Sequence, residues 1–140
     1  MYKRILVGYD GSEGSKKALE HAIYLAKELG AELTALWARS SLPHYPETVD
    51  EVEEEKESAT TFLQAITKDL MTFSKTHGID IKADAKSGHA AKTISDYAKE
   101  KSFDLIVLGH RGHSGLWGSL LGHTADKVSE HAHCSVLIVR

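Results

Sequence analysis

The stretch Leu105-Ile-Val-Leu108, followed at once by Gly109-His-Arg-Gly112, decides the fold of this chain. Its apolar half is a short uninterrupted run, which is typical of a parallel strand buried on both faces. Glycines at the end of such a strand let the backbone approach an anion closely, and a following helix directs free N–H groups at it. The stretch therefore predicts a nucleotide-phosphate site at the end of a strand.

The residues after this strand are unusually rich in glycine and in hydrogen-bond donors. They include Gly112, Gly115, Gly118 and Gly122, together with His110, Arg111, His113 and Ser114. Such small and polar residues contribute little to a hydrophobic core. We therefore expect one glycine-rich loop here, followed by a short helix from Thr124 to His131.

The composition is that of an ordinary globular protein in water. The chain has 140 residues, of which 41% are hydrophobic and 26% charged. A chain of this length buries roughly two-thirds of its unfolded surface in one core, so we expect a single domain over residues 1–140. The formal net charge of −3 gives no basic field, which argues against a nucleic-acid partner.

Cysteine content and hydropathy favour a cytoplasmic location. Cys134 is the single cysteine, so no internal disulfide is possible, and we expect it to be a small core residue. The N-terminus enters a strand at once and lacks the apolar core of a signal peptide. No apolar run approaches the ~20 residues that span a bilayer, so we expect no membrane partner.

Hydrophobic periodicity predicts strands that alternate with helices. The expected strands cover residues 5–7, 33–38, 81–85, 105–108 and 135–139. Apolar residues at spacings of three and four predict helices over 18–29, 49–77 and 91–98, the first ended by Gly30. This order implies right-handed crossovers and a parallel sheet with helices on both faces, an α/β fold.

With these elements in place, the chain resembles the universal stress protein family over nearly its whole length. The resemblance rests on the opening Ile5-Leu-Val-Gly-Tyr-Asp10-Gly-Ser12, on Phe103-Asp-Leu-Ile-Val-Leu-Gly109 and on the closing His133-Cys-Ser-Val-Leu-Ile-Val139. Gly109, Gly112 and Gly122 also keep the glycine spacing of the ATP-binding branch, although His123 stands where that branch has Ser or Thr, and Thr124 follows it.

The resemblance implies a doubly wound, Rossmann-like fold of the adenine nucleotide α-hydrolase type, with strand order 3-2-1-4-5. Ligands of open α/β sheets bind at the switch point, here between the first and fourth strands. The implied function is a stress-response module that binds an adenine nucleotide, ATP foremost, with Mg²⁺ near Asp10. The implied partner is a second copy, paired through Val136, Leu137, Ile138 and Val139; that apolar strand has no covering tail and needs a partner.

The resemblance to the family also implies which residues would contact the nucleotide. Backbone groups from Gly109 to Gly115 would cradle the phosphates, and Gly122, His123 and Thr124 would close over them. Gly8 and Tyr9 would flank the pocket, and the backbone of Ala38 would meet the adenine. Arg111 is either a phosphate-binding cation or a solvated loop residue.

Asp10 and His123 each leave alternatives open. Asp10 is either the N-cap of the first helix or a carboxylate near the ribose, the adenine or a divalent ion. For His123, either its imidazole donates to phosphate, or Thr124 substitutes for it, or the pocket takes a smaller ligand. If His123 is the donor, affinity rises as the pH falls through the imidazole range.

Other nucleotide-binding and catalytic signatures are absent. The chain has no G-x-x-x-x-G-K-[ST] motif, no G-x-G-x-x-G motif and no G-x-S-x-G elbow. Hydrolysis of ATP would need a placed base, and Asp10 and the loop histidines are the candidates. His110 and His113 lack the further ligands of a zinc site. We therefore expect binding with at most slow hydrolysis; the alternatives are a slow nucleotide hydrolase, or a dimer that retains no ATP and acts through its surface.

Overall fold

The computed structural model describes residues 1–39, 49–110 and 114–140, without the side chains of 51, 55 and 114–122. The strands are β1 (Arg4–Gly8), β2 (Glu32–Arg39), β3 (Ile81–Ser87), β4 (Leu105–Gly109) and β5 (Ser135–Val139). The helices are α1 (Glu13–Leu29), α2 (Val49–His77), α3 (Ala90–Glu100) and α4 (Ser114–His131). Strands and helices alternate along the chain, as the periodicity predicts.

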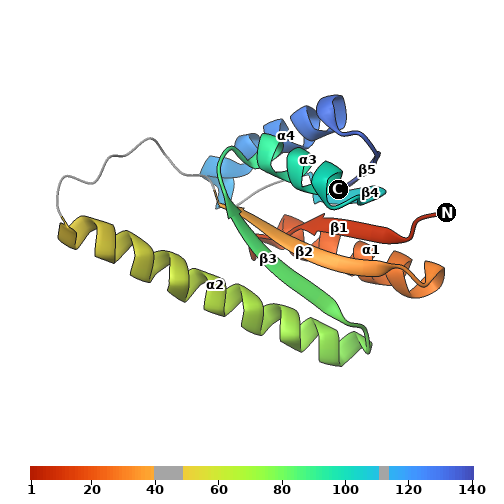
Figure 1. Ribbon diagram of the computed structural model, residues 1–140, viewed down its shortest axis with the longest axis horizontal. Coiled ribbons are helices and arrows are strands. Elements are labelled where there is room, and N and C mark those ends of the chain that lie inside the picture. Colours follow the sequence, from red (N-terminus) through yellow and green to blue (C-terminus); the bar gives the residue numbers. More distant parts are fainter. Residues whose placement is uncertain (40–48, 111–113) are drawn as a thin grey trace.

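The five strands form one parallel sheet in the order β3-β2-β1-β4-β5, which confirms the expected fold. The central strands β1 and β4 pair in register, with Ile5 opposite Leu105 and Val7 opposite Val107. Figure 1 shows α3 and α4 together on one side of the sheet and α2 on the other, beside β3. The edge strands are β3 and β5, and the order of the strands reverses between β1 and β4.

Alternation along the strands separates two hydrophobic cores. Ile5 and Val7 of β1 belong to the core that α1 and α2 cover, whereas Leu6 belongs to the core that α3 and α4 cover. All three side chains are fully buried. Because consecutive residues of a strand point to opposite faces, a continuous apolar run is what a doubly covered strand requires.

The first helix illustrates how the sequence sets its boundaries. Ser12 is the N-cap, and its hydroxyl accepts a hydrogen bond from the N–H of Ser15 at 3.2 Å. Gly30 ends the helix with a φ of 64°, a left-handed conformation that glycine adopts without strain. Between them, Ala18, Leu19, Ala22, Ile23 and Ala26 form the buried stripe.

The structure corrects one part of the sequence interpretation. The segment expected to be a loop until Thr124 is helical from Ser114 onward, so Gly115, Gly118 and Gly122 lie within α4. The physical reason is the spacing of Leu116, Trp117, Leu120 and Leu121, which keeps a helical period through the glycines. Each internal glycine costs a helix only about 1 kcal/mol relative to alanine, which tertiary packing overrides.

No helix in the described ranges is long and apolar enough to cross a membrane. Cys134 is half-buried against the core beneath α3 and α4, which agrees with a small core residue. Burial raises the pKa of its thiol, and the nearby Asp104 carboxylate adds to that rise.

Candidate functional site

A hollow opens where β1 and β4 end, at the point where the strand order reverses. Its walls come from the ends of β1, β2 and β4 and from the helices α1, α3 and α4. The lining residues are Gly8, Tyr9, Asp10, Ser15, Leu36, Ala38, Ala90, Ile94, Leu108, Gly109, Thr124 and Ala125. The hollow is small, about 50 Å³, and it is open to solvent on one side. The switch-point prediction therefore coincides with a cavity.

Asp10 lies at the mouth of this hollow and is held by the start of α1. Its carboxylate Oδ1 accepts a hydrogen bond from the N–H of Ser12 at 2.9 Å, and its own N–H donates to the Ser15 hydroxyl at 3.3 Å. Ser12, and not Asp10, is the N-cap of α1. The N-cap interpretation of Asp10 is therefore wrong, and its carboxylate is oriented by a turn of its own.

Tyr9 contributes to the hollow and also reaches the opposite side of the sheet. Its N–H donates to the carbonyl oxygen of Leu36 at 3.0 Å, which ties the end of β1 to β2. Its side chain is 2% exposed and packs in the core beneath α1 and α2, where the hydroxyl donates to Asp69 Oδ2 at 3.2 Å. Burial, reinforced by the Asp69 carboxylate, raises the pKa of this phenol, so the hydroxyl stays protonated.

Glycine is required at position 109 for packing. A Cβ atom there would lie 2.5 Å from the carbonyl oxygen of Gly14 in α1, a contact that real structures do not tolerate. At Gly8 a Cβ atom would lie 2.7 Å from Cδ2 of Leu108, which is the end of a flexible side chain. The close approach between β4 and α1 thus explains why position 109 holds a glycine, whether or not a ligand binds there.

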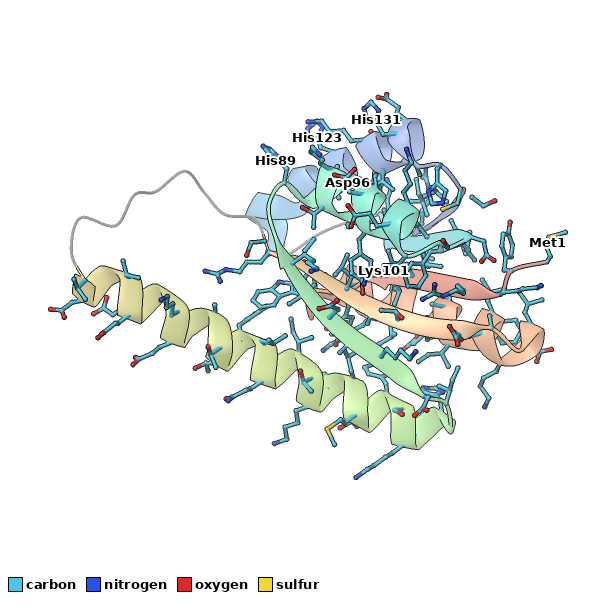
Figure 2. All side chains as sticks on the ribbon, viewed as in Figure 1. Met1, His89, Asp96, Lys101, His123 and His131 are labelled. Carbon is cyan, nitrogen blue, oxygen red and sulfur yellow. The ribbon has the colours of Figure 1, made fainter. Side chains whose placement is uncertain are left out.

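Thr124 and His123 lie on different sides of α4. Thr124 is half-buried and lines the hollow, whereas the side chain of His123 is exposed. Figure 2 shows His123 at the outer surface of the molecule, directed away from the sheet. The neighbouring residue Ala125 is 2% exposed and also lines the hollow. Of the two residues, the structure therefore brings Thr124, and not His123, to the switch point.

The remaining predicted residues fall into three groups. Arg111, Gly112 and His113 lie outside the described residues. Ser114, Gly115 and Gly122 belong to α4. His110 is half-buried, and its N–H donates to the carbonyl oxygen of Val139 at 2.7 Å, which connects the end of β4 to β5.

The chain matches the universal stress protein family over residues 1–140. It belongs to that family. The universal stress protein YxiE of Bacillus subtilis is 39% identical over 153 residues, with all of both chains covered. Among solved structures, the universal stress protein UspA from Lactobacillus plantarum is 30% identical with a TM-score of 0.85, covering 99% of this chain and 98% of that one. A universal stress protein in complex with cAMP is 27% identical with a TM-score of 0.75, covering 99% and 97%.

Sequence reasoning missed one wall of the hollow in this universal stress protein. Ala90 and Ile94, in the first turns of α3, line it together with Leu36 and Leu108. Their apolar side chains at helical spacing are indistinguishable from ordinary core residues in a sequence. The signal in the sequence was Gly88, which stands between the expected strand and the expected helix. In the structure its φ of 140° marks a sharp turn from β3 into α3 at the same edge of the sheet.

Within the described residues of this universal stress protein, no group of three or more His, Cys, Asp or Glu side chains is arranged to hold a metal ion. His89, His123 and His131 are all exposed near the outer side of α3 and α4 (Figure 2). Asp10 is the one carboxylate among the described residues that line the hollow.

Proposed function

We propose that this protein binds an adenine nucleotide, ATP foremost, in the hollow between β1 and β4, and that it acts as a stress-response binding module. The observation that carries the proposal is the coincidence of a cavity with the switch point of the sheet. The solved relative in complex with cAMP supports it, because that chain shares the fold and 27% of its residues with this one.

The apolar side of the hollow suits a purine base. Leu36 and Ala38 of β2 and Ala90 and Ile94 of α3 face it with small or aliphatic side chains. Apolar walls of this kind suit the faces of a flat heterocycle, and backbone groups at the strand end would supply its polar contacts. Because the enclosed space is small, the sugar and phosphates of a bound nucleotide would extend across the open edge of the sheet.

The phosphates would then lie where β4 leads into α4. The positive end of the helix dipole and the free N–H groups of the first turn favour an anion there. Thr124, which lines the hollow, would donate its hydroxyl to the ligand in place of the residue at position 123. Arg111 and Gly112 would contribute from the segment between β4 and α4.

Asp10 would bind the ribose or a Mg²⁺ ion that arrives with the nucleotide. Its Oδ1 accepts from Ser12, while its Oδ2 has no hydrogen bond to another described residue. Mg²⁺ bound to ATP needs few protein ligands, and one carboxylate satisfies that requirement. Among the described residues that line the hollow, Asp10 is the candidate for a base that activates water, and the start of α1 fixes its orientation, so we expect binding without rapid turnover.

Calorimetric titration of nucleotide-stripped protein with ATP, AMP and cAMP, each with and without Mg²⁺, tests the proposal. We expect stoichiometric binding that Ala90→Leu abolishes, because the larger side chain fills the hollow. Ala65→Leu, at an exposed position of α2, is the matched control and should bind as the wild type does. No binding up to millimolar nucleotide would favour the alternative of a dimer that acts through its surface.

We further propose that the protein is a homodimer paired through β5. Val136, Leu137 and Ile138 are half-buried although β5 is an edge strand. An apolar edge with unpaired N–H and C=O groups is a template for another strand, and a second copy would satisfy both requirements. Static light scattering at micromolar concentration tests this, and a monomer mass would reject it.

A further inference from the structure

The solvent face of α2 carries a stripe of exposed side chains at spacings of three and four residues. Its charged and apolar members are Asp50, Glu54, Glu57, Lys68, Met71 and Lys75. Spacings of three and four keep side chains on one side of a helix. Figure 1 shows that α2 lies beside β3 and that its N-terminal half extends beyond the sheet. The side chains of the stripe are exposed along the helix.

The charge of this stripe changes sign near the middle of the helix. All three ionisable members before the middle are acidic, and both after it are lysines. The helix dipole favours this order only in the first and last turns. Glu57 lies beyond the first turn of α2 and Lys68 lies before its last turn. The dipole therefore does not account for the pattern.

The charges of the stripe also lack partners in their own chain. Within the described residues, Asp50, Glu57, Lys68 and Lys75 form no ion pair, although ion pairs occur elsewhere, as between Lys92 and Asp96. Thr61 and Gln64, which continue the stripe through the middle, are exposed and uncharged. The face is thus acidic at one end, basic at the other and neutral between.

We propose that α2 docks antiparallel on α2 of a second copy of this chain. With the two-fold axis level with the point between Phe62 and Leu63, Asp50 faces Lys75 and Glu57 faces Lys68. Each acid lies as far from that midpoint as its lysine, so one axis matches both pairs. The symmetry doubles each pair, as it does in any interface between identical surfaces.

The same axis also places the apolar member of the stripe. Glu54 and Met71 lie at equal distances from the midpoint, so the exposed Met71 covers the aliphatic stem of Glu54 on the other copy. This interface lies at the β3 end of the sheet, opposite the β5 edge. It can therefore form whether or not β5 is paired.

Exposed ion pairs are weak and are screened by salt, so the docking is weak and salt-dependent. Sedimentation velocity of the full chain over a concentration series, at low and at high salt, measures it. We expect an association step at low salt that weakens roughly tenfold at high salt. If β5 pairs first, the step joins two dimers; if not, it joins two monomers.

Two charge-reversed variants identify the surface. Asp50→Lys with Glu57→Lys makes all four pairing positions of the stripe basic and leaves Glu54 unchanged, and Lys68→Glu with Lys75→Glu makes all four pairing positions acidic. Each variant alone should lose the association step, because like charges then face each other on the two copies. An equimolar mixture of the two variants should restore the association step. Glu20→Lys with Glu28→Lys, on the exposed side of α1, is the control for the first variant, because it changes the net charge equally, and it should associate as the wild type does.

The restoration separates docking from folding, because a misfolded variant is not rescued by another variant. The proposal is overturned if the wild type sediments as one species at all salt concentrations. It is equally overturned if the variants associate as the wild type does, or if the mixture fails to restore the step.

Discussion

Gly109 at the end of β4 lies directly against the backbone of Gly14 in α1. A Cβ atom at position 109 would be 2.5 Å from the Gly14 carbonyl oxygen and 2.7 Å from its carbonyl carbon. Neither group can move without displacing α1 or β4. The glycine for which we propose phosphate binding is therefore a packing residue, and the proposed binding has to be measured separately from the packing.

Gly109→Ala should destabilise the fold in the absence of any nucleotide. We expect a loss of about 1–3 kcal/mol, because the added methyl group meets backbone atoms that cannot yield. Thermal unfolding of the ligand-free protein measures it. Gly8→Ala is the control, since its methyl group meets only the end of the Leu108 side chain. Equal stability of the two variants would contradict the packing role.

The phenol of Tyr97 should make the fold sensitive to alkali. Its hydroxyl donates to Asp84 Oδ2 at 2.9 Å, and burial together with that carboxylate raises its pKa to about 12. The folded state holds the proton more tightly than the unfolded state does. This contribution is therefore fully present below about pH 10 and is lost as the pH rises from about 10 to 12.

Denaturant unfolding across this pH range tests the role of Tyr97. Tyr97→Phe should lower stability near neutral pH by about 1 kcal/mol and should lose less than the wild type between about pH 10 and 12. Tyr24→Phe, whose ring is 65% exposed, should follow the wild type throughout. Parallel pH profiles for the wild type and Tyr97→Phe would refute the assignment.

Thr124 should matter for nucleotide affinity and His123 should not. Thr124→Val keeps the side-chain volume but removes the hydroxyl at the hollow, so we expect affinity to fall roughly 3- to 10-fold. His123→Ala should leave affinity unchanged, because that side chain is exposed. Calorimetry on both variants measures the difference. A rise in wild-type affinity between about pH 8 and 5.5 that His123→Ala removes would return His123 to the site.

The β5 edge should tolerate charge less well than the β3 edge. Ile138→Lys places an ammonium group on the half-buried side of β5 and should convert the expected dimer to a monomer in light scattering. Ala83→Lys, at an exposed position of β3, is the control and should not change the mass. A dimer that survives Ile138→Lys, with unchanged thermal stability, would move the interface away from β5.

Periodicity predicted most of this fold because both of its signals were clear in this sequence: continuous apolar runs for strands, and apolar residues at spacings of three and four for helices. The run from Leu105 to Leu108 is apolar at every position, and all four side chains are buried, as a doubly covered strand requires. The 49–77 helix was predicted with the observed ends. By contrast, the start of α4 was not predicted. Over residues 114–123 the glycine content favours a loop whereas the apolar spacing favours a helix, and the structure has the helix.

The site was predicted only in part for a related reason. Asp10 and Gly109 follow buried strands, and parallel strands bring their carboxyl ends to one edge, so their proximity follows from the order of the elements. Ala90 and Ile94 could not be identified, since they resemble core residues. The orientations of His123 and Thr124 depend on how α4 is rotated about its axis. The sequence did not predict this rotation, because the first part of the helix was expected to be a loop.

The pairing of β1 with β4 also determines when the site can exist. Arg4 begins β1 and Lys3 precedes it, yet the carboxylate that accepts from their N–H groups belongs to Asp104, which is 101 residues from Lys3. A chain emerging from the ribosome can form β1, α1 and β2 early, because these neighbours are close in sequence. The hollow needs β4 and then α4, so it is completed only after residues 105–131 have left the ribosome. The proposed nucleotide binding should therefore begin only once a nascent chain has emerged beyond α4.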